Sequence, residues 1–479
     1  MSRKTFLKAL AGAATLGGFA RSGQAAPPRL RMPAEWEQHE RCVMAFCAAW
    51  DVYGDADVEA IRFEQARIAK AIAGFEPVTM LVNPEDTDAA RVLCGPTVEI
   101  VTGWHDDVWT RDTLPTIVRD EAGKRHAIGW NFNAWGEKFE QGYARDRDLA
   151  ERFARLNDLP FEASRLVMEG GSIETDGAGL AITTETAVLN ANRNPGINKA
   201  AVEAEWTRLL GASKVVWLAG SRVDRITEGH VDGVVKFLAP GQLVVEVTDD
   251  PEDPEYEELQ DNQARLRGLT DATGRPVTLH ELLRPRYDRI GERGEDFAGA
   301  YVNAYIANGG VVLPKFGDRV RDEAARELFT RLSGRPALSV AVDTIVEMGG
   351  GIHCNTQQIP AGRRTARKCG RIQLETRSRT TPKGATSPSG CFLPSVIAPI
   401  KSNRVLPCRS PPSRCFQPPR VSRRRSSTGR RRPPPASPTS PMTRSTSLPA
   451  FLQHCWCSPF CQCCRCCARR DTAIRRRQN

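Results

Sequence analysis

The strongest constraint on the fold is a pattern of short strands and helices that recurs from about residue 32 to residue 360. Pairs of strand-like runs, joined by turns rich in glycine, alternate with amphipathic helix-like runs and further single strands. Such an order predicts an α/β protein with strands in several short sheets rather than one long parallel sheet. The paired runs are residues 170–189, 231–247 and 300–317, and helix-like runs are residues 58–75, 197–211 and 318–334.

This order stops shortly after residue 360, and the charge changes sign at the same place. Residues 361–479 hold 26 Lys and Arg residues and two acidic ones, a net charge of +24, whereas residues 1–360 hold 41 basic and 55 acidic residues, a net charge of −14. The overall charge of +10 therefore describes neither part. An acidic body favours a cationic substrate and argues against binding to nucleic acid.

The last part of the chain, residues 363–479, is rich in Arg, Pro, Ser and Cys and has neither a strand nor a helix period. Such a composition predicts a disordered tail, which we interpret as the product of a shifted reading frame or as a non-homologous extension past the end of the domain. A basic tail for nucleic acid or membranes, or a metal site in the cysteine cluster at 455–467, are the alternatives. The cysteine spacing lacks two separated Cys-x-x-Cys pairs.

The first 26 residues have the character of an export signal. Basic residues near the start precede a short apolar run and small residues, and "SRKTFLK" resembles a twin-arginine signal with lysine in the second basic position. We expect export, to the periplasm, or a cytoplasmic protein if the signal is not used. No apolar run is long enough to predict a membrane span.

One glycine-rich segment, "EMGGGIHCNTQQIP" at residues 347–360, presents a single cysteine, Cys354. A thiol placed there can be a nucleophile, a metal ligand or a buried structural residue. A nucleophilic cysteine needs a histidine to exchange protons. If the segment is extended, the neighbouring His353 points to the opposite face and is a poor partner.

A second segment, "EGHVDG" at residues 228–233, offers a better partner in His230. If it is extended, His230 and Asp232 point to the same side, and an acid such as Glu169 in "MEGG" could orient the imidazole. Asp112 in "WTRD" adds a further carboxylate. Taken singly, these residues are also explained as a structural histidine, a turn residue and a surface ion pair.

Several other reaction classes lack their usual motifs. We find no HExxH, no Cys-x-x-Cys pair before residue 361, no Walker A motif, no well-placed GxGxxG and no Gly-x-Ser-x-Gly. These absences argue against a zinc protease, a nucleotide-binding protein and a serine hydrolase of that type. We therefore predict neither a metal nor a cofactor.

The motifs together resemble the agmatine deiminase family, which is related to the bacterial peptidyl-arginine deiminases and belongs to the guanidino-group-modifying superfamily. The likeness covers residues 30–362 and runs in order through the segments already quoted. It also includes the segments "MPAEWEQHE", "GWNFNAWGEKF" and "AYIANGGVVLPKFGD". The resemblance implies a catalytic domain over residues 30–362. It also implies a five-bladed α/β propeller, the pentein fold, with the site in a central channel and a possible homodimer.

The resemblance also implies a role for each candidate residue. Cys354 matches the nucleophile, His230 the proton shuttle and Glu169 the acid that partners it, while Asp112 and Asp232 match the two carboxylates that bind the guanidinium.

Five further residues concern substrate binding. Trp109 matches a tryptophan that lines the substrate channel, and we expect Gly350 and Gly351 to let the backbone approach the planar substrate. Phe46-Cys47 stands where the family usually has Trp-Pro, a departure in the substrate loop near the N-terminus.

The implied reaction is hydrolysis of agmatine to N-carbamoylputrescine and ammonia, a step towards putrescine and other polyamines, through a covalent amidino-cysteine. Deimination of free or peptidyl arginine, amidino transfer to an amine and an inactive binding protein are the alternatives. An amine-bearing substrate would favour acids such as Asp106 or Asp107 at the mouth of the site.

Overall fold

The computed structural model describes residues 28–47, 57–138 and 142–362 of the 479-residue chain. The predicted export signal, residues 1–26, and the predicted tail, residues 363–479, lie outside the described residues. No helix of the described part has the length and apolar character needed to cross a membrane.

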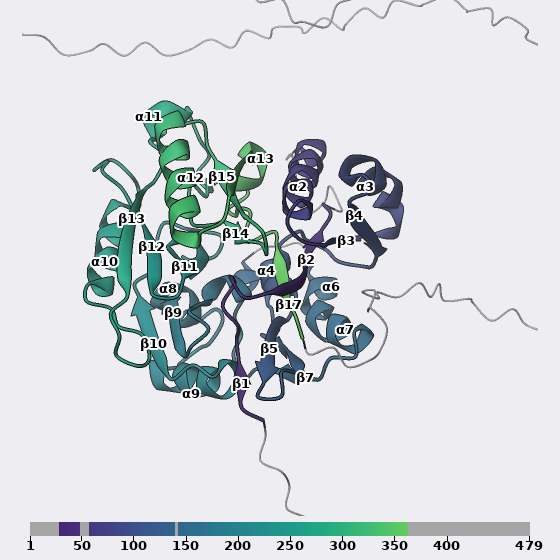
Figure 1. The fold of residues 1–479 in the computed structure, drawn as a ribbon, viewed down its shortest axis with the longest axis horizontal. Coiled ribbons are helices and arrows are strands. Elements are labelled where there is room, and N and C mark those ends of the chain that lie inside the picture. Colours follow the sequence, from purple (N-terminus) through teal and green to yellow (C-terminus); the bar gives the residue numbers. More distant parts are fainter. Residues whose placement is uncertain (1–27, 48–56, 139–141, 363–479) are drawn as a thin grey trace, which may run out of the picture. The chain divides into compact units, whose positions relative to one another are not determined.

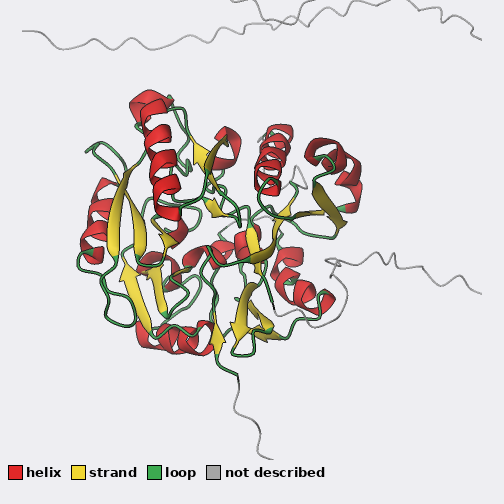
Figure 2. Ribbon diagram, viewed as in Figure 1, coloured by secondary structure: helices red, strands yellow, loops and turns green. Residues whose placement is uncertain are grey.

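Five small sheets make up the described part, which is a mixed α/β fold (Figures 1 and 2). Their strand orders are β17-β2-β3-β4, β1-β5-β6-β7, β10-β9-β8, β11-β12-β13 and β14-β15-β16. The strands are β1 Leu30–Arg31, β2 His39–Ala45, β3 Val78–Val82, β4 Val98–Thr102, β5 Thr116–Asp120, β6 Arg125–Gly129, β7 Phe161–Ala163, β8 Glu174–Thr175, β9 Leu180–Thr184, β10 Lys214–Leu218, β11 Val235–Ala239, β12 Gln242–Val247, β13 Thr278–Leu283, β14 Tyr305–Ile306, β15 Val311–Lys315, β16 Ala337–Ala341 and β17 Gln357–Pro360.

Each sheet contains the same unit, an antiparallel strand pair followed by a helical connection and a parallel strand. The pair β11–β12 is antiparallel, α10 follows, and β13 then adds parallel to β12. The predicted succession of hairpin, helix and strand is therefore confirmed. The helices are α2 Val58–Ala73, α3 Thr87–Cys94, α4 Thr110–Thr113, α5 Ala134–Glu137, α6 Ala144–Arg147, α7 Leu149–Leu156, α8 Glu185–Val188, α9 Lys199–Leu210, α10 Tyr256–Leu266, α11 Tyr287–Ile290, α12 Arg319–Ser333 and α13 Asp343–Val346, with 3₁₀ turns η1 Pro84–Asp86, η2 Gly170–Ser172 and η3 Val231–Gly233.

Helix α9 illustrates why these segments are helical. The Asn198 side chain accepts a hydrogen bond from the N–H of Ala201 at 3.0 Å and caps the first turn. Val202 and Trp206, four residues apart, are fully buried on one face. Gly211 ends the helix with a φ of +70°, which glycine adopts without steric cost.

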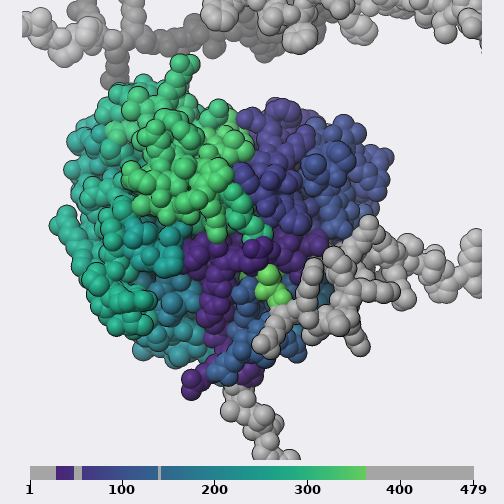
Figure 3. All heavy atoms as spheres, viewed as in Figure 1, coloured from purple at the N-terminus to yellow at the C-terminus, as the bar shows by residue number. Residues whose placement is uncertain are grey.

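The two ends of the described chain meet in one sheet. Strand β17 pairs antiparallel with β2, so that Gln357 lies opposite Val43. Figure 3 places the residues near both ends next to each other on the surface of this unit. The segment that carries Cys354 is thereby fixed by a strand from the start of the fold.

Candidate active site

Cys354 lies in a turn, residues 352–355, directly before β17. It is buried, with 6% of the residue exposed. Its Sγ atom is 3.5 Å from Oδ2 of Asp232 and 3.1 Å from Nδ2 of Asn303. The backbone carbonyl of Cys354 accepts a hydrogen bond from the N–H of Arg111 at 3.1 Å. The thiol therefore lies between a carboxylate and an amide, next to the segment that carries Asp112.

His230 is buried among carboxylates at the start of η3. Its Nε2 atom is 3.0 Å from Oε2 of Glu169, and its Nδ1 atom is 3.9 Å from Oδ2 of Asp112. Glu169 in turn accepts hydrogen bonds at 2.8 and 2.9 Å from Nε of Arg193. Nδ1 of His230 makes no hydrogen bond within the described residues, so this nitrogen is available for proton exchange.

Asp112 sits on the one-turn helix α4, and both of its carboxylate oxygens accept hydrogen bonds. Oδ1 accepts from the backbone N–H of Gly171 at 2.9 Å and Oδ2 from Nε1 of Trp135 at 2.9 Å. A Cβ atom at position 171 would lie 2.5 Å from Nδ1 of His230. Only glycine allows the backbone to reach the carboxylate this close to the imidazole.

The three glycines at 349–351 face protein atoms. A Cβ atom at Gly350 would lie 2.4 Å from the ring of Trp109, and one at Gly351 would lie 2.6 Å from Oδ1 of Asn303. Trp109 is 5% exposed and belongs to the largest buried apolar cluster. Close packing accounts for these glycines. Contact of Gly350 and Gly351 with a substrate, and the channel role of Trp109, stay predictions.

Two segments that were considered as extended have another backbone conformation. Residues 230–232 are not extended, because Val231–Gly233 form η3. His353 lies in the turn at 352–355 rather than in an extended segment. Its Nδ1 atom is 2.7 Å from Oδ2 of Asp232 and its Nε2 atom is 2.8 Å from Oε2 of Glu35. His353 is therefore a neighbour of the site through Asp232.

Burial and charge set the protonation of these groups. Burial raises the pKa of the Cys354 thiol well above its usual range, and the charges of Asp232 and Asp112 raise it further. At His230 burial opposes the charge, but Asp112 and Glu169 outweigh burial and raise the pKa to about 9. The substrate-free site thus favours a neutral Cys354 thiol and a charged His230 imidazolium at neutral pH.

The pKa values of Asp112 and Asp232 are shifted in opposite directions. Burial raises the pKa of Asp112. At Asp232 burial acts in the same direction, but the hydrogen bond and charge of His353 outweigh it and lower the pKa. Asp232 is therefore the carboxylate that keeps its charge most readily.

Sequence reasoning missed several residues that contact the site. Arg193 anchors Glu169, Trp135 donates to Asp112, Asn303 contacts the sulfur, and Glu35 contacts His353. The one sequence signal that could have found some of these residues is a local concentration of aromatic, acidic and asparagine residues, which surrounds Glu35, Trp135 and Asn303. Two of these contacts, Asn303 with Cys354 and Glu35 with His353, join residues 51 and 318 positions apart, and local patterns do not encode such pairs.

The acids considered for a substrate amine are engaged elsewhere. Oδ2 of Asp106 accepts a hydrogen bond from the backbone N–H of Arg145 at 2.8 Å. Oδ1 of Asp107 accepts a hydrogen bond from the backbone N–H of Val108 at 2.6 Å, and the backbone N–H groups of Asp106 and Asp107 donate to Asp146 at 2.9 and 2.8 Å. Recognition of a substrate amine by these acids stays a prediction.

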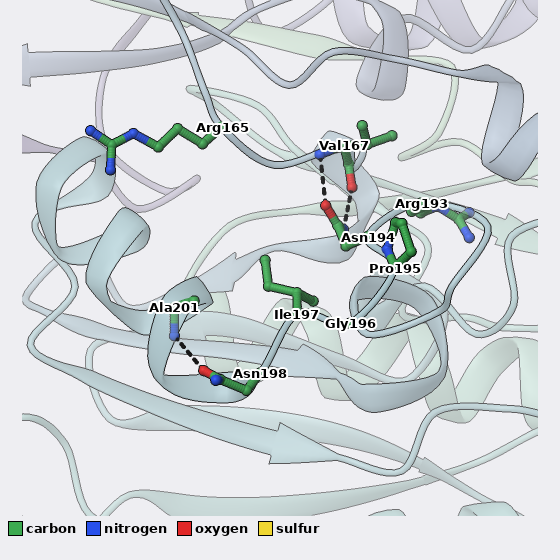
Figure 4. Close-up of a pocket in the computed structure, with 9 residues that line it drawn as sticks. All are labelled: Arg165, Val167, Arg193, Asn194, Pro195, Gly196, Ile197, Asn198 and Ala201. Atoms are coloured by element: carbon green, nitrogen blue, oxygen red, sulfur yellow. Dashed lines mark hydrogen bonds between the residues drawn. The ribbon is translucent and has the colours of Figure 1, made fainter.

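A surface hollow lies beside this cluster and shares one residue with it. Its walls include Arg165, Arg193, Asn194 and the start of α9 (Figure 4). Nε of Arg193 donates a hydrogen bond to Glu169 at 2.8 Å. Asn194 joins the hollow to Val167 through two hydrogen bonds, at 3.0 and 2.7 Å. The hollow contains none of the candidate catalytic side chains. Arg193 is its link to the site.

Solved structures share this fold. The agmatine deiminase of Enterococcus faecalis aligns with a TM-score of 0.66 and 30% identity, covering 69% of this chain and 96% of that one. An agmatine deiminase of C. jejuni aligns with a TM-score of 0.61 and 22% identity, covering 71% and 98%, a likeness in fold. Fold and site thus place the chain in the class of α/β deiminases.

The sequence comparison identifies the family. A profile of the Porphyromonas-type peptidyl-arginine deiminases matches residues 31–360. The agmatine deiminase of Stutzerimonas stutzeri is 36% identical over 351 residues, which covers 69% of this chain and 95% of that protein. The chain belongs to the Porphyromonas-type peptidyl-arginine deiminase family.

Proposed function

We propose that this protein hydrolyses the guanidinium group of agmatine to N-carbamoylputrescine and ammonia through a covalent intermediate on Cys354. The observation that carries the proposal is the buried thiol 3.5 Å from Asp232, in a cluster that also holds Asp112 and an imidazolium. Membership of the family, and relatives named agmatine deiminase at 30% and 36% identity, support agmatine as the substrate.

The substrate would bind by charge and shape. A guanidinium is planar and always protonated, and carboxylates bind it with paired, charge-assisted hydrogen bonds. Asp232 lies 3.5 Å from the Cys354 sulfur and Asp112 lies 3.9 Å from Nδ1 of His230, and both carboxylates raise the pKa of the Cys354 thiol. A cation bound between them offsets this effect, so that substrate binding itself favours the thiolate.

The chemistry then proceeds in two halves. The Cys354 thiol loses its proton to water as the guanidinium binds, and the thiolate adds to the central carbon. His230 donates its proton to the departing nitrogen, which leaves as ammonia. The carbon remains bonded to sulfur as an amidino-thioether. Neutral His230 next accepts a proton from water, the hydroxide adds to the same carbon, and the C–S bond breaks to release the ureido product.

We also infer that the five sheets are the blades of a five-bladed α/β propeller around this site. The support is the repeated position of the site residues, since each lies within five residues before the first antiparallel strand of one unit. Asp112 precedes β5, Glu169 precedes β8, Asp232 precedes β11, Asn303 precedes β14 and Cys354 precedes β17.

The test is turnover of agmatine by the full chain, with ammonia and the ureido product both measured. We expect the wild type to release them in equal amounts, and Cys354→Ser to lower kcat by about a thousandfold or more, because the hydroxyl is a far weaker nucleophile. Cys94→Ser is the matched control, a buried thiol on α3, with activity within about twofold of the wild type.

Three results would overturn the proposal. They are an active Cys354→Ser variant, faster turnover of arginine or an arginine peptide than of agmatine, and ammonia-free transfer of the amidino group to an added amine.

A further inference from the structure

The imidazole of His353 bridges two buried carboxylates, one inside the site and one beneath it. Nδ1 is 2.7 Å from Oδ2 of Asp232 and Nε2 is 2.8 Å from Oε2 of Glu35, and the three residues are at most 8% exposed. We propose that His353 is a positioning residue, which fixes the Asp232 carboxylate for the guanidinium by tying it to Glu35. The role rests on the proposed function, because that function makes Asp232 a substrate ligand.

Two carboxylates determine the state of the ring. A carboxylate accepts hydrogen bonds, so each contact needs an N–H on His353, and a neutral ring has one such group. The form with both nitrogens protonated satisfies both contacts and adds a positive charge between two negative ones. His353 is therefore held as a rigid double donor, a role distinct from that of His230 with its unbonded Nδ1 atom.

Glu35 gives the bridge a fixed base. Its Oε1 atom accepts the backbone N–H of Ile306 at 2.7 Å, and its Oε2 atom is 3.1 Å from Nζ of Lys236 and 3.9 Å from Arg111. These contacts come from three different segments of the chain. Because these contacts hold the Glu35 carboxylate in place, its contact with Nε2 fixes the orientation of the His353 ring.

The bridge has a consequence for substrate binding. Oδ2 of Asp232 already accepts the short contact from His353 and lies 3.5 Å from the Cys354 sulfur. No hydrogen bond to Oδ1 of Asp232 is present within the described residues, which leaves this oxygen for the guanidinium. The bridge thus selects one oxygen of Asp232 for the substrate and fixes the plane in which it is presented.

Two amide substitutions separate the two ends of the bridge. The side-chain nitrogen of asparagine is as many bonds from Cα as Nδ1 of histidine, and that of glutamine as many as Nε2. His353→Asn therefore keeps a donor towards Asp232, and His353→Gln keeps one towards Glu35. If His353 only stabilises the fold, the two variants should have similar activity. If His353 positions Asp232, His353→Asn should retain more activity than His353→Gln.

We expect His353→Asn to lower kcat/KM for agmatine by about 10-fold and His353→Gln by about 100-fold, the range of one or two hydrogen bonds to charged groups. Most of the loss should lie in KM, because Asp232 binds the substrate before reaction. His126→Asn is the matched control, because its shorter side chain loses the 3.1 Å contact between Nε2 of His126 on β6 and Oδ2 of Asp120 on β5, outside the site. Its kcat/KM should stay within about twofold.

A spectrum of the substrate-free protein tests the bridge without turnover. In the full chain labelled with ¹⁵N-histidine, both ring nitrogens of His353 should appear as hydrogen-bond donors, with signals assigned by their loss in His353→Asn. An unprotonated ring nitrogen, or equal activity of the two amide variants, would overturn the proposal. If the wild type does not convert agmatine, the proposed function is wrong, and the spectrum alone then tests whether His353 bridges Asp232 and Glu35.

Discussion

At the scale of single residues, the site uses two histidines in different ways. His230 has one ring nitrogen on Glu169 and the other unbonded beside Asp112. His353 has both nitrogens on carboxylates. A ring with one unbonded nitrogen can exchange protons with a substrate, whereas a ring bonded at both ends is suited to hold a neighbour in place.

The raised pKa of His230 links stability to pH. The ordinary pKa is 6.5 and the folded value is about 9, so the folded protein binds the proton more tightly than the unfolded chain. This contribution is complete below pH 6.5 and is lost as pH rises through about 9. Between these limits, the loss of the His230 proton should lower the free energy of unfolding of the wild type by up to about 3 kcal/mol.

Urea unfolding of the wild type and of His230→Asn, measured from pH 6 to pH 9.5, checks this expectation. The stability gap between the two proteins should narrow as the pH rises. The buried Glu174 and Glu246, with pKa values raised to about 7 and about 8, also lower stability with pH, but they are present in both proteins. A gap that stays constant across this range would contradict the assignment.

At the scale of elements, helix ends are fixed by glycines in the left-handed region. Gly211 ends α9 with a φ of +70° and Gly334 ends α12 with a φ of +67°. A Cβ atom at Gly211 would lie 2.3 Å from the carbonyl oxygen of Leu30, whereas one at Gly334 would meet no atom within 4 Å. The two positions share a backbone conformation and differ in their neighbours.

Alanine substitutions at these caps separate backbone strain from tertiary contact. Gly334→Ala should cost about 1 kcal/mol in the free energy of unfolding, because alanine pays the steric cost of a positive φ. Gly211→Ala should cost about 3 kcal/mol or more, since strand β1 must also move away. Chemical denaturation of both variants measures the difference, and equal losses would rule out the contact with Leu30 as its cause.

At the scale of the whole described unit, the site is assembled by five segments that each precede a strand pair. The residues of these segments come from positions between Asp112 and Cys354. Strand β17 joins the last of these segments to β2 through four residue pairs. The position of Cys354 therefore depends on contact between the two ends of the described chain.

Truncations test this dependence. A chain that ends at residue 362 keeps β17, and we expect it to retain agmatine turnover within about threefold and the melting temperature of the full chain within a few degrees. A chain that ends at residue 356 lacks β17 and exposes the edge of β2, so it should lose cooperative unfolding and activity. If the chain that ends at residue 362 lost both activity and cooperative unfolding, residues after 362 would be needed.

Much of this protein could be predicted from local patterns. Turn residues, caps and apolar periods predict the hairpin at 231–247 and helices such as α9 and α12, because those signals act within a few residues. The condition of an extended backbone at His353 is not met, because residues 352–355 form a turn and local sequence does not distinguish the two conformations there. The same limit applies to η3, where a short 3₁₀ turn replaces the expected extended backbone.

The sequence alone determined the α/β class, the strand and helix order, and the residue types able to bind and cleave a guanidinium. Only the tertiary structure decided that Glu35 lies under His353, that Arg193 holds Glu169, and that Asn303 contacts the sulfur. Secondary structure is encoded by neighbours along the chain. The geometry and protonation of a buried site depend on groups up to hundreds of positions apart, which meet only when the sheets pack together.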